Sequence, residues 1–320
     1  MVHTDLDRPL NMCTSLIREE TFRGRPVYRL AFGDLEALVD SWHGMSVVSL
    51  LLQGRELLWY DESRYLAGNT YGITLLFPTP NRIRDDYFHF DGRVIGPSRM
   101  HGFAKDVRYN VEALDIGSSC VRIAGSFHLY ERAPEFSEFP FPLEFIVSIS
   151  ISDGRIRWDY TVRNLGMTPL GYGFALHPFF ARPQEASVRL NAEYVMEAGP
   201  DKLPTGALVP VVGTRFDLLS DRTVSDILGL DTVYYSPGQL ACHVSFGSSG
   251  PAMDFPTSDD FRHFVVYAPE GASFFCVEPQ TCSTDCHNLY DRGDREVSNL
   301  LLVVPGDERS GWVEIVFSGG

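Results

Sequence analysis

The sequence has little cysteine, no long apolar run and no pattern of a targeting segment. Six cysteines among 320 residues are sparse and fit a reducing compartment with free thiols. The longest apolar stretches, such as 47–52, are far shorter than the roughly 20 residues that span a bilayer. The opening residues Met1–Asp5 lack the basic and then apolar pattern of a signal peptide. We therefore expect a cytoplasmic protein without membrane contact.

Positive charge is also scarce. The chain has 27 Lys and Arg against 42 Asp and Glu, which gives a formal net charge of −15. Nucleic acids and anionic membranes are polyanions and would be repelled, so we expect neither as a partner. The chain also lacks low-complexity linkers and solenoid-type repeats. We expect a single domain over 1–320, with a core at about 25–318.

Helical periodicity is scarce, whereas apolar and polar residues alternate with a period of two. Residues 143–152 follow this alternation, and Ile146 is its one break. Asp153-Gly154 follows, a dipeptide typical of two-residue hairpin turns, and the alternation resumes over 155–163. The pattern predicts a half-buried antiparallel hairpin.

Further short strands are predicted between turn residues. They lie at 27–32, 37–40, 45–52, 121–130, 171–177, 187–190, 240–246, 263–268, 273–277, 300–304 and 312–317. One short helix is expected near 220–228, where Ser220 or Asp221 could cap its N-terminus. Many evenly spaced strands without alternating helices are typical of all-β proteins. We therefore expect a large antiparallel β-sandwich.

Two titratable residues of complementary type occupy similar places. His177 follows an apolar run and precedes Pro178, and Glu278 follows another and precedes Pro279. Because proline cannot donate to a β-ladder, we expect each side chain to lie where its strand leaves the sheet. The apolar residues 274–277 before Glu278 are expected to desolvate its carboxyl partly, which raises its pKa toward that of a useful base. A solvated rim glutamate is the alternative, but the recurrence favours a functional pair.

Several short motifs, taken in order, carry a family resemblance. They resemble those of the aldose 1-epimerase (galactose mutarotase-like) family, and the resemblance runs from about Gly33 to Phe317. The motifs are Asn81-Arg82-Ile83, His101-Gly102, the Pro140/Pro142 stretch, Gly173-x-x-x-His177-Pro178-Phe179-Phe180, Leu230-Asp231 and Glu278-Pro279-Gln280-Thr281. After Thr281 the chain departs from the family pattern, because 282–288 replace the usual Pro-Asp pair and Asn. This change flanks the expected pocket and bears on which sugar is the substrate.

The resemblance implies that the protein interconverts the α and β anomers of an aldose on a single large antiparallel β-sandwich, without a metal or organic cofactor. Glu278 matches the base that takes the proton of the anomeric hydroxyl, and His177 the acid that protonates the ring oxygen. The substrate-binding set is His101, Arg82, Asp231 and Asn81. A small-molecule sugar is the implied partner, and the chain is expected to be a monomer or homodimer. Ring closure reverses ring opening, so both groups need pKa values not far from neutrality.

Three of the binding assignments have plainer alternatives. His101 could be an ordinary loop histidine. Arg82 could form a surface ion pair with Asp85 or Asp86. The place of Asp231 could be taken by one of the nearby acids Asp254, Asp259 and Asp260.

Two clusters offer metal ligands. The first contains Cys276, Cys282, Cys286 and His287, but it lacks paired Cys-x2-Cys spacing, so we expect no zinc site. The second contains Asp85, Asp86, His89 and Asp91, which we interpret as a solvated hairpin of two short strands.

Three other functions are considered. One is a non-catalytic carbohydrate-binding or regulatory protein of the same fold, because a fold does not guarantee activity. Another is an epimerase acting on a hexose 6-phosphate. The third is a glycosidase that uses two carboxylates, Glu278 with Asp231, although it leaves both histidines unexplained.

Overall fold

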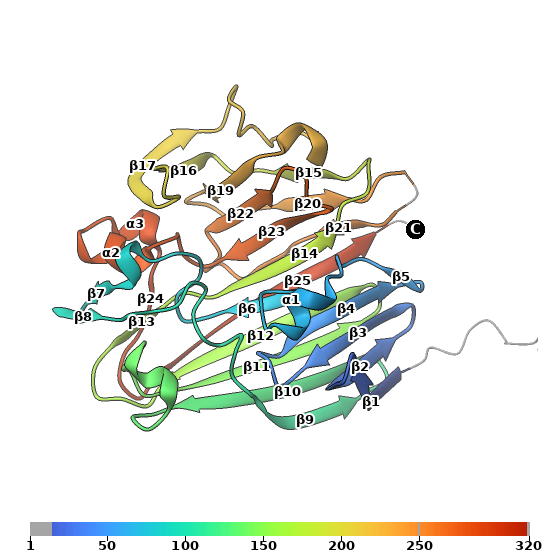
Figure 1. Cartoon of the computed structure of the whole chain (residues 1–320), viewed down its shortest axis with the longest axis horizontal. Coiled ribbons are helices and arrows are strands. Elements are labelled where there is room, and N and C mark those ends of the chain that lie inside the picture. Colours follow the sequence, from blue (N-terminus) through green and yellow to red (C-terminus); the bar gives the residue numbers. More distant parts are fainter. Residues whose placement is uncertain (1–14, 249, 319–320) are drawn as a thin grey trace, which may run out of the picture.

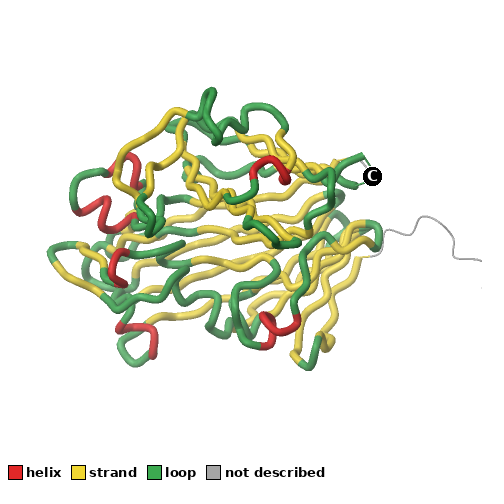
Figure 2. The backbone as a smooth tube through the Cα atoms, turned by 45° about the horizontal axis from the view of Figure 1, so that its top comes forward, coloured by secondary structure: helices red, strands yellow, loops and turns green. Residues whose placement is uncertain are grey.

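The computed structural model describes residues 15–248 and 250–318. Two large antiparallel sheets pack against each other, and their inward faces share one hydrophobic core. Strands dominate the molecule, and its few short helices lie outside the strand layers (Figures 1 and 2). The predicted all-β antiparallel sandwich is therefore confirmed. Met1–Asp5, which entered the expectation of a cytoplasmic location, lie outside the described residues.

The first sheet contains His177 and Glu278. In the described part of the chain it has twelve strands in the order β1-β2-β3-β4-β6-β14-β23-β22-β19-β16-β17, with β5 paired to β4. Their bounds are β1 Ser15–Phe22, β2 Arg25–Phe32, β3 Leu35–Asp40, β4 Ser46–Leu52, β5 Arg55–Glu56, β6 Ile73–Leu76, β14 Ala175–Ala181, β16 Tyr194–Ala198, β17 Pro204–Pro210, β19 Leu230–Tyr235, β22 His263–Ala268 and β23 Phe274–Gln280.

The second sheet closes the other side of the core. Nine described strands follow the order β18-β15-β20-β21-β25-β12-β11-β10-β9. Their bounds are β9 Asn110–Ile116, β10 Cys120–Leu129, β11 Leu143–Ser152, β12 Arg155–Asn164, β15 Ser187–Leu190, β18 Arg222–Thr223, β20 Cys242–Ser245, β21 Ala252–Asp254 and β25 Glu308–Ser318.

Several short elements lie outside the two large sheets. Two small sheets pair β7 (Phe88–Phe90) with β8 (Arg93–Ile95) and β13 (Leu170–Tyr172) with β24 (Leu301–Val303). The α-helices are α1 Glu62–Leu66, α2 Cys286–Asp291 and α3 Arg295–Ser298, and the 3-10 helices are η1 Arg84–Asp86, η2 Pro134–Ser137 and η3 Val224–Ile227. Among the described residues, no helix has both the length and the apolarity needed to cross a membrane.

The predicted hairpin at 143–163 forms one wall of the core. β11 pairs with β12 from Leu143↔Asn164 to Ser152↔Arg155, so Asp153-Gly154 makes the turn. Aromatic rings then link this hairpin to the segments that lead into the first sheet. Phe145 stacks on Phe77 with ring centroids 4.4 Å apart, and Tyr160 stacks on Phe174 at 4.1 Å. These contacts tie the backbone beside the site to the most buried part of the molecule.

Three predicted elements differ from the structure. The strand expected at 171–177 is two strands, because β13 pairs with β24 and β14 belongs to the first sheet. Neither His177 nor Glu278 ends its strand, since β14 continues through Pro178 and β23 through Pro279. The helix expected near 220–228 is only η3, which follows β18 and has no side-chain cap from Ser220 or Asp221.

Candidate functional site

His177 and Glu278 face each other across neighbouring strands. β14 and β23 pair at Ala175↔Gln280 and again at Phe179↔Cys276, and this register places His177 opposite Glu278. The backbone N–H of Thr281 donates to the Phe174 carbonyl in the same ladder. Because hydrogen-bonded and non-bonded pairs alternate in antiparallel ladders, His177 and Glu278 form a non-bonded pair, in which side chains approach most closely.

Two prolines open the ladder beside this pair. The Thr281 N–H points from β23 toward β14, whereas the Phe179 N–H points away from β23, to the Gly72 carbonyl. Successive N–H groups of a strand point to opposite neighbours, so Pro178 and Pro279 occupy the positions that would donate between β14 and β23. Neither has an N–H, so this section of the ladder loses donors. Each strand continues because its other edge stays paired, β14 with β6 at Pro178↔Ile73 and β23 with β22 at Phe264↔Pro279. This is why proline did not end either strand, contrary to the sequence prediction.

The two side chains contact each other on the outer face of the sheet. His177 Nε2 lies 3.3 Å from Glu278 Oε1, and the side-chain amide of Gln280 donates to Glu278 Oε2 at 3.1 Å. The His177 ring stacks on Phe179 with centroids 4.4 Å apart and planes 3° from parallel. His177 and Glu278 are only 5% and 2% exposed. The pair is thus held rigidly and is largely withdrawn from water.

Burial shifts both pKa values toward the neutral forms. Desolvation raises the pKa of the Glu278 carboxyl well above its ordinary 4.5, as the sequence suggested, and only the bond from Gln280 and the charge of Arg82 oppose this. Desolvation also lowers the pKa of the His177 imidazole well below 6.5. Both shifts favour the neutral acid–imidazole form of the pair over its ion-pair form. The ion pair and the neutral acid–imidazole pair are two forms with the same proton count.

Asn81 and Arg82 lie in the connection that follows β6, and they orient one another. The Asn81 side-chain oxygen accepts from the Arg82 backbone N–H at 2.9 Å and from its Nη1 at 3.2 Å. Arg82 Nη2 then forms an ion pair with Asp231 Oδ2 of β19 at 3.3 Å. The alternative partners Asp85 and Asp86 are therefore wrong for Arg82. Guanidinium and carboxylate are both partly exposed, so they can also bind hydroxyl groups of a ligand.

His101 reaches the same place from a tight turn. Its backbone N–H donates to the Asn81 carbonyl at 2.9 Å, and its ring meets the His177 ring edge to face at 5.4 Å. Burial and the nearby charges of Lys105 and Arg82 lower its pKa to about 3. Its Nδ1 has no hydrogen-bond partner among the described residues. His101 is therefore a neutral imidazole with hydrogen-bonding capacity to spare.

Gly102 makes this turn possible and supports a prediction. Gly102 has φ +69°, and a Cβ there would lie 2.2 Å from the Phe77 carbonyl oxygen. We expect Gly102→Ala to lower the free energy of unfolding by about 2–4 kcal/mol, through the left-handed backbone and the backbone clash. Urea denaturation measures this change.

Gly33→Ala is the matched control. Gly33 has a similar φ of +60° but nothing within 4 Å of the added Cβ. Only the backbone cost of about 1–2 kcal/mol should remain. Equal losses in the two variants would contradict a close approach at Gly102.

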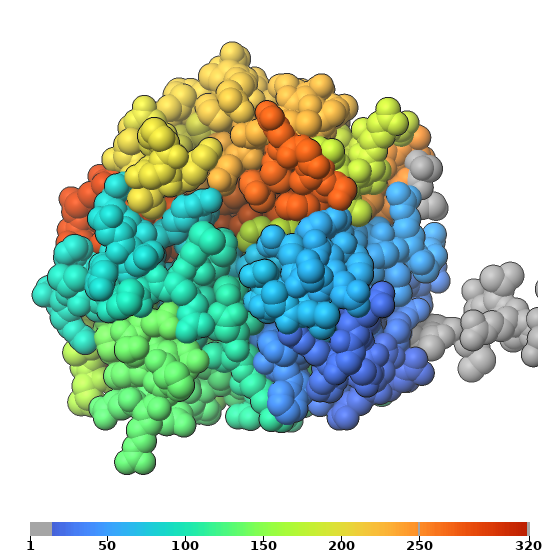
Figure 3. Space-filling view, viewed as in Figure 1, coloured from blue at the N-terminus to red at the C-terminus, as the bar shows by residue number. Residues whose placement is uncertain are grey.

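These residues surround one cavity. It encloses about 610 Å³ of space, part of it open to solvent, and His177, Glu278, His101, Arg82 and Asp231 all line it. Asn81 completes the predicted set, so every site residue named from the sequence lies at this cavity. On the face shown in Figure 3, segments from the first third of the chain (blue to teal) meet segments beyond residue 200 (yellow to orange).

Sequence reasoning missed several other lining residues, among them Arg64, Tyr267 and Phe274. Arg64 comes from α1, and no motif marks it. Tyr267 pairs with Asp231 on one side and with Cys276 on the other. Strand alternation could have placed Tyr267 on the same face as these residues if β19 had been predicted.

The three acids offered as alternatives to Asp231 lie outside the cavity. Asp254 contacts His243 at 2.8 Å, Asp260 binds Arg309, and Asp259 is exposed. None of the three lines the cavity, whereas Asp231 does. The Asp85–Gly92 segment, interpreted as a hairpin of two short strands, begins in η1 and contains only β7 and the turn. Its partner strand β8 follows at Arg93–Ile95, so the hairpin exists but lies further along the chain than expected.

Metal-ligating atoms gather at one point among the described residues. A ring nitrogen of His177, the Cys276 sulfur and a Glu278 oxygen lie within 4.8 Å of one another. Burial raises the pKa of the Cys276 thiol well above 9, which opposes the thiolate that a metal needs. The four residues considered from sequence form no such group among the described residues. His287 Nε2 donates to the Gly171 carbonyl at 2.8 Å, and its Nδ1 faces the Cys286 thiol at 3.5 Å.

Known proteins resemble this chain in sequence and in fold. A family model described as aldose 1-epimerase matches residues 26–315. A galactose mutarotase-like protein from Clostridium acetobutylicum superposes with a TM-score of 0.83 at 20% identity, over 96% of this chain and 99% of that one. Galactose 1-epimerase from Lactobacillus acidophilus superposes with a TM-score of 0.77 at 13% identity, over 97% and 100%.

A galactose mutarotase-like protein from Lactobacillus casei gives a TM-score of 0.74 at 18% identity, over 91% of this chain and 100% of that one. A search of curated proteins finds no match. At these identities the structural similarity establishes the fold. The family model covers most of the sequence, and the chain therefore belongs to the aldose 1-epimerase family.

Proposed function

We propose that the protein interconverts the α and β anomers of an aldose, with Glu278 as base and His177 as acid. The observation that carries the proposal is the contact of a buried carboxyl and a buried imidazole, 3.3 Å apart, at a cavity lined by hydrogen-bonding side chains. The cavity also has aromatic walls in Phe179 and Phe274. Aromatic faces of this kind suit the apolar face of a sugar ring.

The chemistry uses the single proton that the pair holds. In the ion-pair form, the Glu278 carboxylate takes the proton of the anomeric hydroxyl and the His177 imidazolium gives its proton to the ring oxygen. The bond between the anomeric carbon and the ring oxygen breaks, and the anomeric oxygen becomes the aldehyde carbonyl. The pair is then in its neutral form, which burial favours. Rotation about the neighbouring carbon–carbon bond and the reverse transfers close the ring on its other face.

Arg82, Asp231, Asn81 and His101 serve as substrate-binding residues in this proposal. The guanidinium of Arg82 has several N–H donors and no acceptor, so its role is to donate hydrogen bonds to the sugar. His101, with a pKa near 3, binds as a neutral imidazole. A set of fixed donors and acceptors holds the sugar so that its anomeric hydroxyl and ring oxygen meet the pair.

Anomer interconversion can be followed directly. Freshly dissolved α-anomers of several aldoses, observed by polarimetry or proton NMR with and without the protein, should equilibrate faster in its presence, and chelator should not abolish this. Binding without acceleration would support a non-catalytic carbohydrate-binding protein instead. Release of the aglycone from aryl glycosides would support a glycosidase.

The role of Asp231 gives a second prediction. Asp231→Asn removes a charged acceptor and frees Arg82, so we expect KM for the preferred aldose to rise by about tenfold or more, with a smaller change in kcat. Progress curves over a range of sugar concentrations separate the two constants. Asp259→Asn, an exposed acid outside the cavity, should change neither. An unchanged KM in Asp231→Asn would remove this residue from the site.

A further inference from the structure

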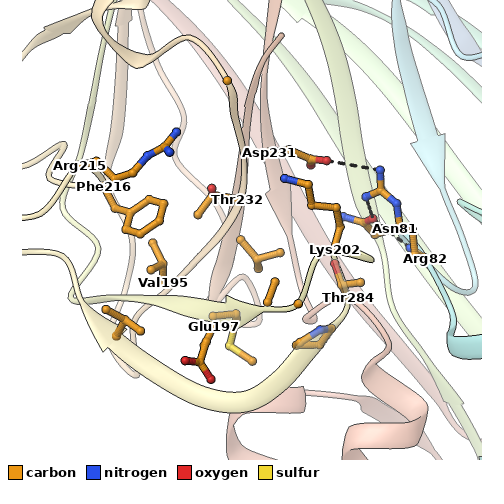
Figure 4. Close-up of a pocket in the computed structure, with 17 residues that line it drawn as sticks. Asn81, Arg82, Val195, Glu197, Lys202, Arg215, Phe216, Asp231, Thr232 and Thr284 are labelled. Atoms are coloured by element: carbon orange, nitrogen blue, oxygen red, sulfur yellow. Dashed lines mark hydrogen bonds and ion pairs between the residues drawn. The ribbon is translucent and has the colours of Figure 1, made fainter.

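A second recess adjoins the cavity at His177 and Glu278. It encloses about 860 Å³, part of it open to solvent, and lies between β16, β17, β19 and the 211–216 segment. Asn81, Arg82 and Asp231 line both hollows, so the two are contiguous at these side chains. Figure 4 shows Arg215 and Phe216 entering this recess from one side and Lys202 from the other, beside the Arg82–Asp231 pair.

Positive charge is in excess in this recess, although the whole chain carries a net charge of −15. Lys202, Arg215 and Arg82 face it together with the carboxylates of Asp231 and Glu197. Asp231 is engaged by Arg82 at 3.3 Å. Glu197 accepts from the Thr205 hydroxyl at 2.7 Å, and its side chain points away from both remaining cations (Figure 4).

Lys202 and Arg215 have no carboxylate partners among the residues that the structure describes. Asp201, beside Lys202, is bound by Arg84 at 3.4 Å. Glu270 lies near Arg215 at Gly229, but the two form no ion pair within 4 Å. Arg215 contacts the Phe216 ring, with its Cζ 5.6 Å from the ring centre. Lys202 sits in the β16–β17 turn with φ +64°, and its backbone N–H donates to the Gly199 carbonyl.

We propose that Lys202 and Arg215 bind a negatively charged group, phosphate or carboxylate, carried by an aldose whose anomeric carbon lies at His177 and Glu278. Two cations without protein anions attract such a group, and Arg215 can grip its oxygens with two N–H donors. The shared boundary at Arg82 lets one molecule occupy both hollows. This inference rests on the proposed function and names the class of its substrate as acidic sugars.

The test compares three sugars and a set of variants. KM and kcat for anomer interconversion are measured by NMR for a neutral hexose, its 6-phosphate and its uronic acid. In Lys202→Gln and Arg215→Gln, KM for the charged sugar that binds best should rise about tenfold each, while kcat and the KM for the neutral hexose stay within twofold. Lys202→Arg should retain most of the affinity. The exposed Arg132→Gln is the matched control, because Arg132 lies in the β10–β11 connection outside both hollows.

Salt provides an independent readout. Raising the ionic strength should increase KM for the charged sugar in the wild-type protein and have little effect in the double variant. Preference for the phosphate or for the uronate identifies which anion the recess accepts. Equal KM values for charged and neutral sugars, or equal effects of Arg132→Gln and the recess variants, would overturn the inference.

Anion binding in the recess can also be tested if the protein accelerates anomer interconversion of no aldose, an outcome that defeats the proposed function. Calorimetric titration with the 6-phosphate and the uronate then measures binding alone. Binding that is lost in the double variant supports the recess as an anion site. Absence of binding to the wild-type protein refutes it.

Discussion

Glu278→Gln is expected to lower kcat for anomer interconversion by about 100- to 10,000-fold, the usual contribution of a positioned base. The amide keeps the size of the carboxyl but cannot accept the proton of the anomeric hydroxyl. Because the change removes proton transfer and leaves Arg82, Asp231 and His101 in place, KM should change much less than kcat. NMR exchange rates at saturating sugar measure this effect.

The same variant should remain folded, and the dependence of its stability on pH is a further check. Burial raises the Glu278 pKa above 4.5, so the folded protein retains a proton that the unfolded chain releases. The free energy of unfolding of the wild type therefore falls as pH rises from 4.5 toward the pKa of the folded state. Glutamine does not titrate, so the free energy of unfolding of the variant lacks this fall. The variant should therefore gain stability relative to the wild type over this pH window. Glu314→Gln, a buried glutamate paired with Arg157, controls for the loss of an ordinary carboxylate and should keep kcat.

His177→Asn should have an effect on kcat of similar size, about 100- to 10,000-fold. Asparagine can donate a hydrogen bond to the ring oxygen, but it cannot deliver a proton as the ring opens. The stack on Phe179 is also lost, so thermal denaturation should accompany the kinetics to show that the variant is folded. The double variant with Glu278→Gln should be little worse than either single one, because the two residues exchange protons as a unit.

The variant His101→Asn distinguishes the role of His101 from that of His177. In our proposal His101 binds the sugar, so its loss should raise KM more than it lowers kcat. His243→Asn, in the second sheet beside Asp254, should change neither constant. Retention of full kcat in His177→Asn together with its collapse in His101→Asn would reverse the assignment of the acid.

Regular alternation explains which parts of the fold could be predicted. The β11–β12 hairpin is polar on one face and apolar on the other, so its period and its Asp153-Gly154 turn are visible in the sequence. β14 and β23 were found but cut short, because proline was read as a terminator and the pairing of each strand's other edge cannot be seen locally. β19 was missed because its register depends on partners from elsewhere in the chain, β16 and β22.

The site could be predicted in its residue types and only partly in its geometry. His177 and Glu278 were recognised by their surroundings, yet their contact depends on the register of strands about one hundred residues apart. The link from Asn81 to both Arg82 and His101 also required the fold. Lys202 and Arg215 belong to no motif, and the recess they share arises from the arrangement of β16, β17 and the segment that follows.

His177 and Glu278, the acid and base of the proposed function, lie on interior strands. Arg82, His101, Lys202 and Arg215 come from connections between strands. A change in the length or composition of those connections can therefore alter which molecule is recognised while leaving the proton-transfer geometry intact. Directed evolution toward new sugars should accordingly concentrate on 77–104 and 199–216 and keep β14 and β23 fixed.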